Sequence, residues 1–238
     1  KKMIKNKRIL ITGNTSGLGF ALTDLLLSGG NRVYSLSKRI QKKKKNLKNQ
    51  VCNLANLKNI NKALNKLIKT KKLDYVFLNA GILGKIDLME NIKLKEVNKV
   101  FKINVFSNKQ IIDYLIKKKI KIKLIIGISS GAAIFPKYGW YLYCSSKSAL
   151  KYMFEAYALE NPKIKFISLS PGLIKTKMQR QIYNVNEKKI PSVVKFKRLN
   201  DLNKIPQPHT IAEKIIDIIP KIAKMKSGTF YDLRQKSE

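Results

Sequence analysis

The chain has 238 residues, 44% of them hydrophobic, which is enough for one α/β domain with a sizeable core. Its formal net charge is +36, from 50 Lys and Arg against 14 Asp and Glu. No run of about 18 apolar residues is present, so no transmembrane helix is predicted. The two cysteines, Cys52 and Cys144, are too few for a disulfide framework and lack metal-ligand spacing. With a basic start, Lys1–Arg8, that leads into a strand pattern without an apolar signal segment, these features predict a reduced, cytoplasmic protein without a metal.

The charge attracts nucleic acid, anionic membranes and anionic metabolites alike. The lysines are spread along the whole chain and crowd surface positions together with Ile and Asn. A coding bias explains this pattern better than a nucleic-acid function, so we expect neither specific nucleic-acid binding nor membrane binding. The run Lys42–Lys45 is interpreted as a solvated loop, and as a further candidate for holding a phosphate.

Strands and helices alternate in the predicted order. In chain order the elements are a strand at Arg8–Thr12, a helix at Gly17–Ser28, strands at Arg32–Ser37 and about 50–52, a helix from Leu57 to about Lys69, a strand at Asp74–Leu78, helical periodicity over Leu94–Lys118, a strand at Lys123–Ile128, a helix at Tyr141–Glu160, a strand at Lys165–Leu169, a helix from the capping-box pattern Thr210–Glu213 to Ile219, and a strand at Thr229–Tyr231. Such alternation predicts one α/β domain over residues 1–238, with a doubly wound parallel sheet of about seven strands and helices on both faces.

The segment 173–209 is the least regular part of the chain and contains Pro191, Pro206 and Pro208. It follows the carboxyl end of a predicted strand. Ligands of open α/β sheets bind outside those ends, and long insertions there are commonly functional. We therefore predict that this segment is a substrate lid.

A glycine-rich turn lies between the first predicted strand and the first predicted helix. Gly13 permits the tight turn, and Gly17 and Gly19 permit close approach of the backbone to a pyrophosphate at the helix N-terminus. The expected dinucleotide contacts in this turn are Gly13, Thr15, Ser16, Gly17, Leu18 and Gly19. The gap of three residues between Gly13 and Gly17 departs from the gap of two in the commonest fingerprint, and a purely structural turn is the alternative.

The end of the second strand should select the cofactor. An NAD site places an acid there for the ribose 2′-hydroxyl, whereas an NADP site places positive charge for the 2′-phosphate. The chain has Ser37, Lys38 and Arg39, without an acid, which favours NADP(H) over NAD(H). The alternative is one more basic loop in a lysine-rich chain.

Tyr143 and Lys147 stand four residues apart on a predicted helix, so their side chains share one face. A nearby cation favours the ionised phenol, which suits Tyr143 for proton exchange with an alcohol or ketone. Ser130 lies thirteen residues upstream, and helix geometry does not choose between it and Ser129. Asn104 falls within a helix, where a satisfied structural asparagine is the alternative to a functional one.

These residues resemble the short-chain dehydrogenase/reductase family, with its single-domain Rossmann fold. The pattern TGxxxGxG matches at Thr12–Gly19, NAG at Asn79–Gly81 and YxxxK at Tyr143–Lys147. A finer resemblance, over Ser129–Gln179, is to the sepiapterin reductase and benzil reductase branch, whose members are NADPH-dependent reductases of ketones beside a second carbonyl or an aromatic group. Ser130 matches the family serine better than Ser129 does.

The resemblance implies a role for each residue. Tyr143 would protonate the forming alkoxide, Lys147 would lower the tyrosine pKa and bind the nicotinamide ribose, and Ser130 would bond the carbonyl oxygen. Asn104 would hold a water that links Lys147 to solvent. The remaining implied cofactor contacts are Asn53, Leu54, Asn79, Ala80, Gly81, Pro171, Gly172, Ile174 and Thr176. Asn53 departs from the usual Asp and should weaken adenine binding.

The predicted function is therefore NADPH-dependent reduction of a ketone or aldehyde, such as a diketone or pterin-like carbonyl. Alternatives are a sugar, nucleotide-sugar or acyl-thioester substrate at the same site, or a basic, non-catalytic binding protein. Trp140, Tyr138 and Met178 are the expected substrate contacts, although Trp140 as core filler is an equal alternative. The resemblance also implies a homodimer or homotetramer paired through the helices at about 94–118 and 141–160.

Overall fold

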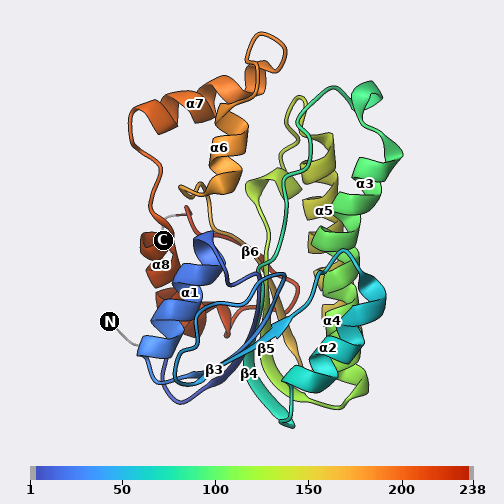
Figure 1. The fold of residues 1–238 in the computed structure, drawn as a ribbon, viewed down its shortest axis with the longest axis vertical. Coiled ribbons are helices and arrows are strands. Elements are labelled where there is room, and N and C mark those ends of the chain that lie inside the picture. The colour runs from blue at the N-terminus through green and yellow to red at the C-terminus, as the bar shows by residue number, and fades with distance from the viewer. Residues whose placement is uncertain (1–3, 236–238) are drawn as a thin grey trace.

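Seven parallel strands form one sheet in the computed structural model, which describes residues 4–235 (Figure 1). The strands are β1 Arg8–Thr12, β2 Arg32–Ser37, β3 Leu47–Val51, β4 Lys72–Leu78, β5 Lys121–Ile128, β6 Lys165–Ser170 and β7 Phe230–Asp232. Their order in the sheet is β3-β2-β1-β4-β5-β6-β7. This order confirms the predicted doubly wound parallel sheet. Residues 1–3 and 236–238 of the predicted domain lie outside the described residues.

Helices cover both faces of the sheet. Helices α1 (Gly17–Ser28) and α8 (Pro208–Ile222) pack on one face, and α2 (Ile60–Leu67), α4 (Ser107–Lys117) and α5 (Tyr141–Glu160) pack on the other. Side chains of a strand alternate between faces. In β1, Leu10 therefore joins the core under α2, α4 and α5, while Ile9 and Ile11 join the core under α1 and α8. In the described residues, no helix is long and apolar enough to cross a membrane.

Several element boundaries differ from the sequence prediction, and two of them are instructive. Strand β3 begins at Leu47, ahead of the predicted 50–52, and pairs along the whole of β2. Helix α8 begins at Pro208, so Thr210 lies inside the helix and the predicted capping box is wrong. Proline has the right φ for the first helical position and starts the helix there.

The helical segment predicted at Leu94–Lys118 is confirmed, but it is not a uniform α-helix. Helix α3 (Leu94–Phe101) and helix α4 are joined by a π-helical turn at Lys102–Phe106. Such turns are rare and often occur at functional sites. Asn104, one of the predicted catalytic residues, is the central residue of this turn.

The neighbours of β1 are β2 and β4, which leaves a crevice at the carboxyl ends of β1 and β4, where ligands of such sheets bind. Helices α6 (Lys177–Tyr183) and α7 (Val194–Asp201) stand above this end of the sheet (Figure 1). The segment 173–209 is thus more regular than its sequence suggests. Its role as a lid stays a prediction.

Candidate active site

In the glycine turn after β1, backbone atoms of the turn lie unusually close together. A Cβ on Gly19 would lie 2.2 Å from the backbone oxygen of Gly13, so a larger residue cannot occupy that position. Gly13 has a φ of +71°, which favours glycine. The side-chain nitrogen of Asn79 donates hydrogen bonds to the backbone oxygens of Thr12 (3.0 Å) and Gly13 (3.1 Å). Asn79 therefore fixes the turn from the end of β4, a role that its motif alone does not reveal.

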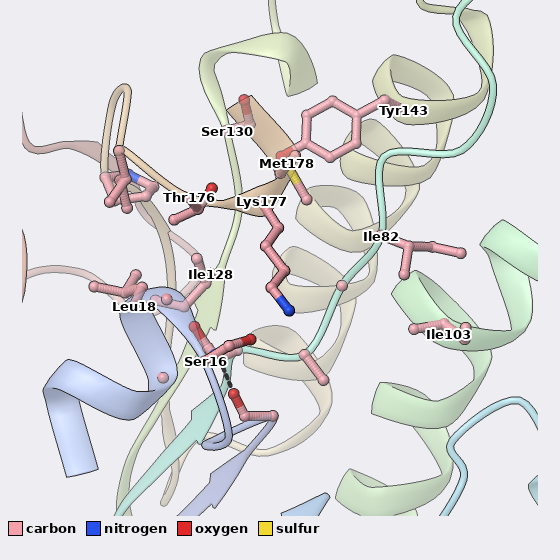
Figure 2. A pocket seen from close by; sticks show the side chains of 18 of the residues that line it. Ser16, Leu18, Ile82, Ile103, Ile128, Ser130, Tyr143, Thr176, Lys177 and Met178 are labelled. Atoms are coloured by element: carbon pink, nitrogen blue, oxygen red, sulfur yellow. Dashed lines mark hydrogen bonds between the residues drawn. The ribbon is translucent and has the colours of Figure 1, made fainter. Parts of the chain in front are cut away.

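A cleft of about 690 Å³ runs from this turn to Tyr143 (Figure 2). Every residue predicted to bind the cofactor lines it, from Gly13 in the turn to Thr176 at the start of the segment 173–209. The predicted substrate contacts Ser130, Trp140, Tyr143 and Met178 line the same cleft. The fold thus brings together residues that are more than 160 positions apart in the chain, and a narrow, glycine-walled crevice at a helix N-terminus fits a dinucleotide.

The end of the cleft beside β2 is positively charged. Lys38 and Arg39 line it and are exposed, as a charge clamp for a phosphate requires. The hydroxyl of Ser37 is occupied, since it donates to Oδ1 of Asn14 (2.7 Å) and accepts from the Asn14 backbone nitrogen (3.0 Å). Ser37 therefore ties β2 to the glycine turn.

Asn53, the predicted adenine contact, already forms a hydrogen bond within the protein. Oδ1 of Asn53 accepts a hydrogen bond from the backbone nitrogen of Ala55 at 3.2 Å. An amide oxygen has two lone pairs, so one remains for a ligand. Asn53 and Leu54 line the cleft as expected.

Ser130, and not Ser129, interacts with Tyr143. The Ser130 hydroxyl lies close enough to the phenol of Tyr143 to oppose the rise in its pKa. Ser130 follows β5, and its Oγ also accepts from the backbone nitrogen of Ala132 at 3.2 Å. The hydroxyl of Ser129 is buried and has no partner among residues 4–235. This neighbourhood favours Ser130 over Ser129, and the catalytic role of Ser130 stays a prediction.

Lys147 is 4% exposed, and its Nζ donates a hydrogen bond to the backbone oxygen of Ile128 at 2.7 Å. Burial lowers the pKa of Lys147 to about 8. Burial also raises the pKa of Tyr143 to about 12, and the neighbouring Ser130 hydroxyl acts in the opposite direction. The expected lowering of the Tyr143 pKa by Lys147 is therefore absent here, because desolvation of the phenol is the larger effect.

Asn104 is buried and does not line the cleft directly. Its Oδ1 accepts from the backbone nitrogen of Ile82 at 2.9 Å, and its Nδ2 donates to the Ile82 oxygen (2.9 Å) and to Oγ of Ser146 (3.0 Å). Its backbone oxygen accepts from the side chain of Asn108. Asn104 thus supports the loop after β4 and lies near Lys147, since a Cβ on Gly81 would meet both side chains within 3.5 Å. The water that it is expected to hold stays a prediction.

Trp140, Phe196 and Tyr143 form an aromatic wall at the far end of the cleft. The ring centroids of Trp140 and Phe196 are 5.1 Å apart, and those of Trp140 and Tyr143 are 6.3 Å apart with an edge-to-face arrangement. Nε1 of Trp140 donates to Oγ of Ser192 at 2.9 Å. Trp140 is both buried in the core and part of the cleft lining, and its contact with a substrate stays a prediction. Tyr138 does not line this cleft and borders a second cavity instead.

Three further side chains that line the cleft were not singled out from the sequence. Lys177 points into the middle of it in Figure 2, and Lys137 and Phe196 line its far end. Lys177 directly follows Thr176, one of the cofactor contacts implied by the family resemblance, so its position in the sequence could have indicated it. Phe196 lies in the predicted lid but was not singled out, and nothing marked Lys137, because both residues reach the cleft only through tertiary packing. Among residues 4–235, no three His, Cys, Asp or Glu side chains gather as metal ligands would.

A model of the short chain dehydrogenase family matches residues 7–187. The chain therefore belongs to this family, whose members are oxidoreductases that use nicotinamide cofactors. It is 26% identical to benzil reductase ((S)-benzoin forming) from Bacillus subtilis, over 95% of this chain and 98% of that one. It is also 26% identical to sepiapterin reductase from Rattus norvegicus, over 94% and 96% of the two chains. These similarities bear out the resemblance to that branch.

A second group of relatives has a different kind of substrate in its name. The chain is 34% identical to 3-oxoacyl-[acyl-carrier-protein] reductase from Rickettsia prowazekii, over 80% of this chain and 81% of that one. Among solved structures, a short chain dehydrogenase family protein from Francisella tularensis matches with a TM-score of 0.82 and 28% identity, over 95% and 96% of the two chains.

Proposed function

We propose that the protein reduces a ketone or aldehyde to an alcohol with NADPH. The observation that carries this proposal is the convergence of Ser130, Tyr143 and Lys147 in the cleft that begins at the glycine turn. A protein that only bound a ligand on this fold would have no need of a hydroxyl, a phenol and a buried ammonium at one point. The non-catalytic alternative is therefore less well supported.

NADPH, when bound, supplies the hydride. Tyr143 donates its proton to the carbonyl oxygen, since a phenol with a raised pKa is protonated at neutral pH. Ser130, whose hydroxyl lies beside the phenol, donates a hydrogen bond to the same carbonyl oxygen. Lys147 binds the nicotinamide ribose, and its charge stabilises the phenolate left after proton transfer. Asn104 holds the loop at Ile82 against the cleft.

The preference for NADP(H) over NAD(H) is supported by the clamp at the adenine end. Lys38 and Arg39 are exposed and line the cleft, and no Asp or Glu of the described residues 4–235 lines it. A phosphate carries about −1.5 to −2 charges at neutral pH, and charge-assisted bonds to it are strong.

Lys177 is proposed to bind the cofactor pyrophosphate. A Cβ on Gly17 would lie 3.2 Å from the methyl carbon of Thr176, so the start of α6 touches the glycine turn. The next side chain, Lys177, extends into the cleft between Ser16 and Ile82 (Figure 2). No hydrogen bond or ion pair joins it to another described residue within 4–235. A free ammonium over the phosphate-binding turn suits a pyrophosphate.

The aromatic wall favours a flat carbonyl compound, such as a diketone or a pterin. Trp140 and Met178 are its proposed contacts. The relatives named after 3-oxoacyl-carrier substrates support an acyl thioester as second candidate. NADPH oxidation, measured with benzil, a pterin, a keto-sugar and a 3-oxoacyl thioester, tests the proposal and ranks these classes. Turnover of none of them, with NADPH bound, would contradict the proposed reaction.

We also propose a cytoplasmic homodimer or homotetramer. Helix α5 exposes Tyr152 and Leu159, which are 74% and 84% accessible. Apolar side chains on one exposed helix suit an interface between copies. Light scattering on the purified protein measures the assembly, and a monomer would contradict this proposal.

A further inference from the structure

The aromatic wall of the cleft ends at a lysine. Nζ of Lys137 lies 5.8 Å from the ring centroid of Phe196, which packs on Trp140, which in turn meets the edge of Tyr143. These four side chains form a row with the phenol at one end and an ammonium at the other. A substrate lying along the wall, with its carbonyl at Tyr143, directs its opposite end toward Lys137.

Lys137 has no acidic partner. It is partly buried, it forms no ion pair with any of residues 4–235, and none of those that line the cleft is Asp or Glu. A ring face attracts an ammonium more weakly than an anion does. In a partly desolvated site an anion would therefore find Lys137 available.

In the proposed function, each of the other cations of the cleft has a role away from the substrate's far end. Lys147 is buried beside Tyr143, Lys38 and Arg39 line the adenine end, and Lys177 lies over the glycine turn. Lys137 is left at the substrate end. It also lines, with Ala132, a second cavity of about 660 Å³, whose lining includes the acidic residue Glu90.

We propose that the substrate carries an anionic group, a carboxylate or a phosphate, which Lys137 binds while the flat carbonyl part lies against Trp140 and Phe196. This inference rests on the proposed function, because it assigns the carbonyl to Tyr143. It narrows the substrate class from flat ketones to acidic flat ketones.

The chain's one tryptophan, Trp140, provides a binding signal. With the enzyme saturated by NADP⁺ no ketone can be reduced, so quenching of Trp140 fluorescence measures affinity alone. The probes are benzil, 4-carboxybenzil and 4-phosphonobenzil, and the last two distinguish carboxylate from phosphate. We expect the better acidic probe to bind at least about tenfold more tightly than benzil, with the difference falling as salt rises.

Lys137→Met should abolish that difference, Lys137→Arg should retain it, and Lys137→Glu should reverse it. Lys163→Met is the matched control, because it removes one charge from an exposed turn before β6, at the amino ends of the strands and thus at the opposite end of the sheet from the cleft. Equal affinity of the wild type for all probes, binding of none, or the same loss in Lys163→Met would overturn the inference. An acidic preference without NADPH oxidation would refute the proposed reaction and leave the anion subsite standing.

Discussion

Nζ of Lys147 lies 5.6 Å from the centroid of the Tyr143 ring, over its face, and donates its hydrogen bond to the Ile128 backbone. The hydrogen bond of the ammonium is thus made to the backbone and not to the phenol oxygen. The phenol keeps its proton, with a pKa raised to about 12, which is the state that a general acid needs before hydride transfer. Lys147 is placed to act after the proton has left.

Tyr143→Phe removes the proton donor and keeps the ring that packs against Trp140. The variant should fold and bind NADPH, yet lose about a hundredfold to ten-thousandfold in kcat, as loss of one acid-base group typically does. NADPH oxidation under saturating cofactor and NADPH titration measure the two properties. Near wild-type kcat in this variant would refute the proposed mechanism.

The buried charge of Lys147 makes stability depend on pH. Burial lowers its pKa from 10.5 to about 8, and unfolding restores the ordinary value. Between about pH 8 and pH 10.5 the unfolded chain therefore binds one more proton than the folded chain, so the free energy of unfolding rises with pH in this window. Below pH 8 the cost of the buried charge is fully present.

We predict that the free energy of unfolding of the wild type, relative to Lys147→Met, rises by about 2 kcal/mol between pH 8 and pH 10. Urea unfolding of both proteins measures it, and taking the difference removes the titration of the other lysines. Parallel curves for the two proteins would show that the Lys147 pKa is not lowered.

Ser129 and Ser130 are adjacent but should respond differently to substitution. Ser130→Ala removes the hydroxyl beside the phenol of Tyr143 that is proposed to bond the carbonyl oxygen, so kcat should fall by about a hundredfold. Ser129→Ala removes a buried hydroxyl that has no partner within residues 4–235, so stability should stay equal or rise by up to about 1 kcal/mol, with activity kept. Activity and urea unfolding of both variants check the ranking. A larger kcat loss in Ser129→Ala would assign the carbonyl contact to Ser129.

The segment 173–209 is held to the rest of the site by Asp87. Oδ1 of Asp87 lies 2.8 Å from Nζ of Lys189 in this segment, and its Oδ2 lies 2.8 Å from Nζ of Lys85. These contacts hold the pKa of Asp87 well below its usual range. Asp87→Asn should loosen the segment, raise the substrate KM and speed proteolysis within 173–209. The control is Glu187→Gln, which breaks only a surface pair with Lys197 and should change neither quantity. Unchanged cleavage in Asp87→Asn would argue against a mobile lid.

The sequence was sufficient for the fold and for the residues that carry motifs. The alternation of buried strands with helices predicted the parallel sheet. The spacing of Tyr143 and Lys147 predicted that both side chains lie in one site. It could not set the pKa values, because the burial of both groups depends on packing across the whole cleft. Nor could it show that the Asn104 amide is used by Ile82, which is 22 residues away in the chain. The wall residue Phe196 and its neighbour Lys137 meet only through tertiary structure.

The cofactor contacts separate into two kinds that one experiment can distinguish. Lys38 and Arg39 lie at the adenine end, where NADP and NAD differ, whereas Lys177 lies over the glycine turn, where they are identical. In the wild type, NADPH should bind at least about tenfold more tightly than NADH, because charge-assisted contacts to the 2′-phosphate are strong. The ratio should shrink as salt rises.

Lys177→Met should weaken both cofactors by about tenfold and leave their ratio unchanged, while neutralising Lys38 and Arg39 should weaken NADPH alone. The matched control is Lys175→Met, since Lys175 is exposed, bonds Asn203 and does not line the cleft. Dissociation constants for both cofactors at two salt concentrations measure the effects without a substrate. The net charge of +36 attracts both dinucleotides, so its effect partly cancels from the ratio of the NADPH and NADH dissociation constants. The Lys175→Met control shows how much each separate affinity falls when one positive charge is lost away from the cleft. A ratio near one in the wild type would refute the phosphate clamp, and an unchanged NADH affinity in Lys177→Met would remove Lys177 from the pyrophosphate.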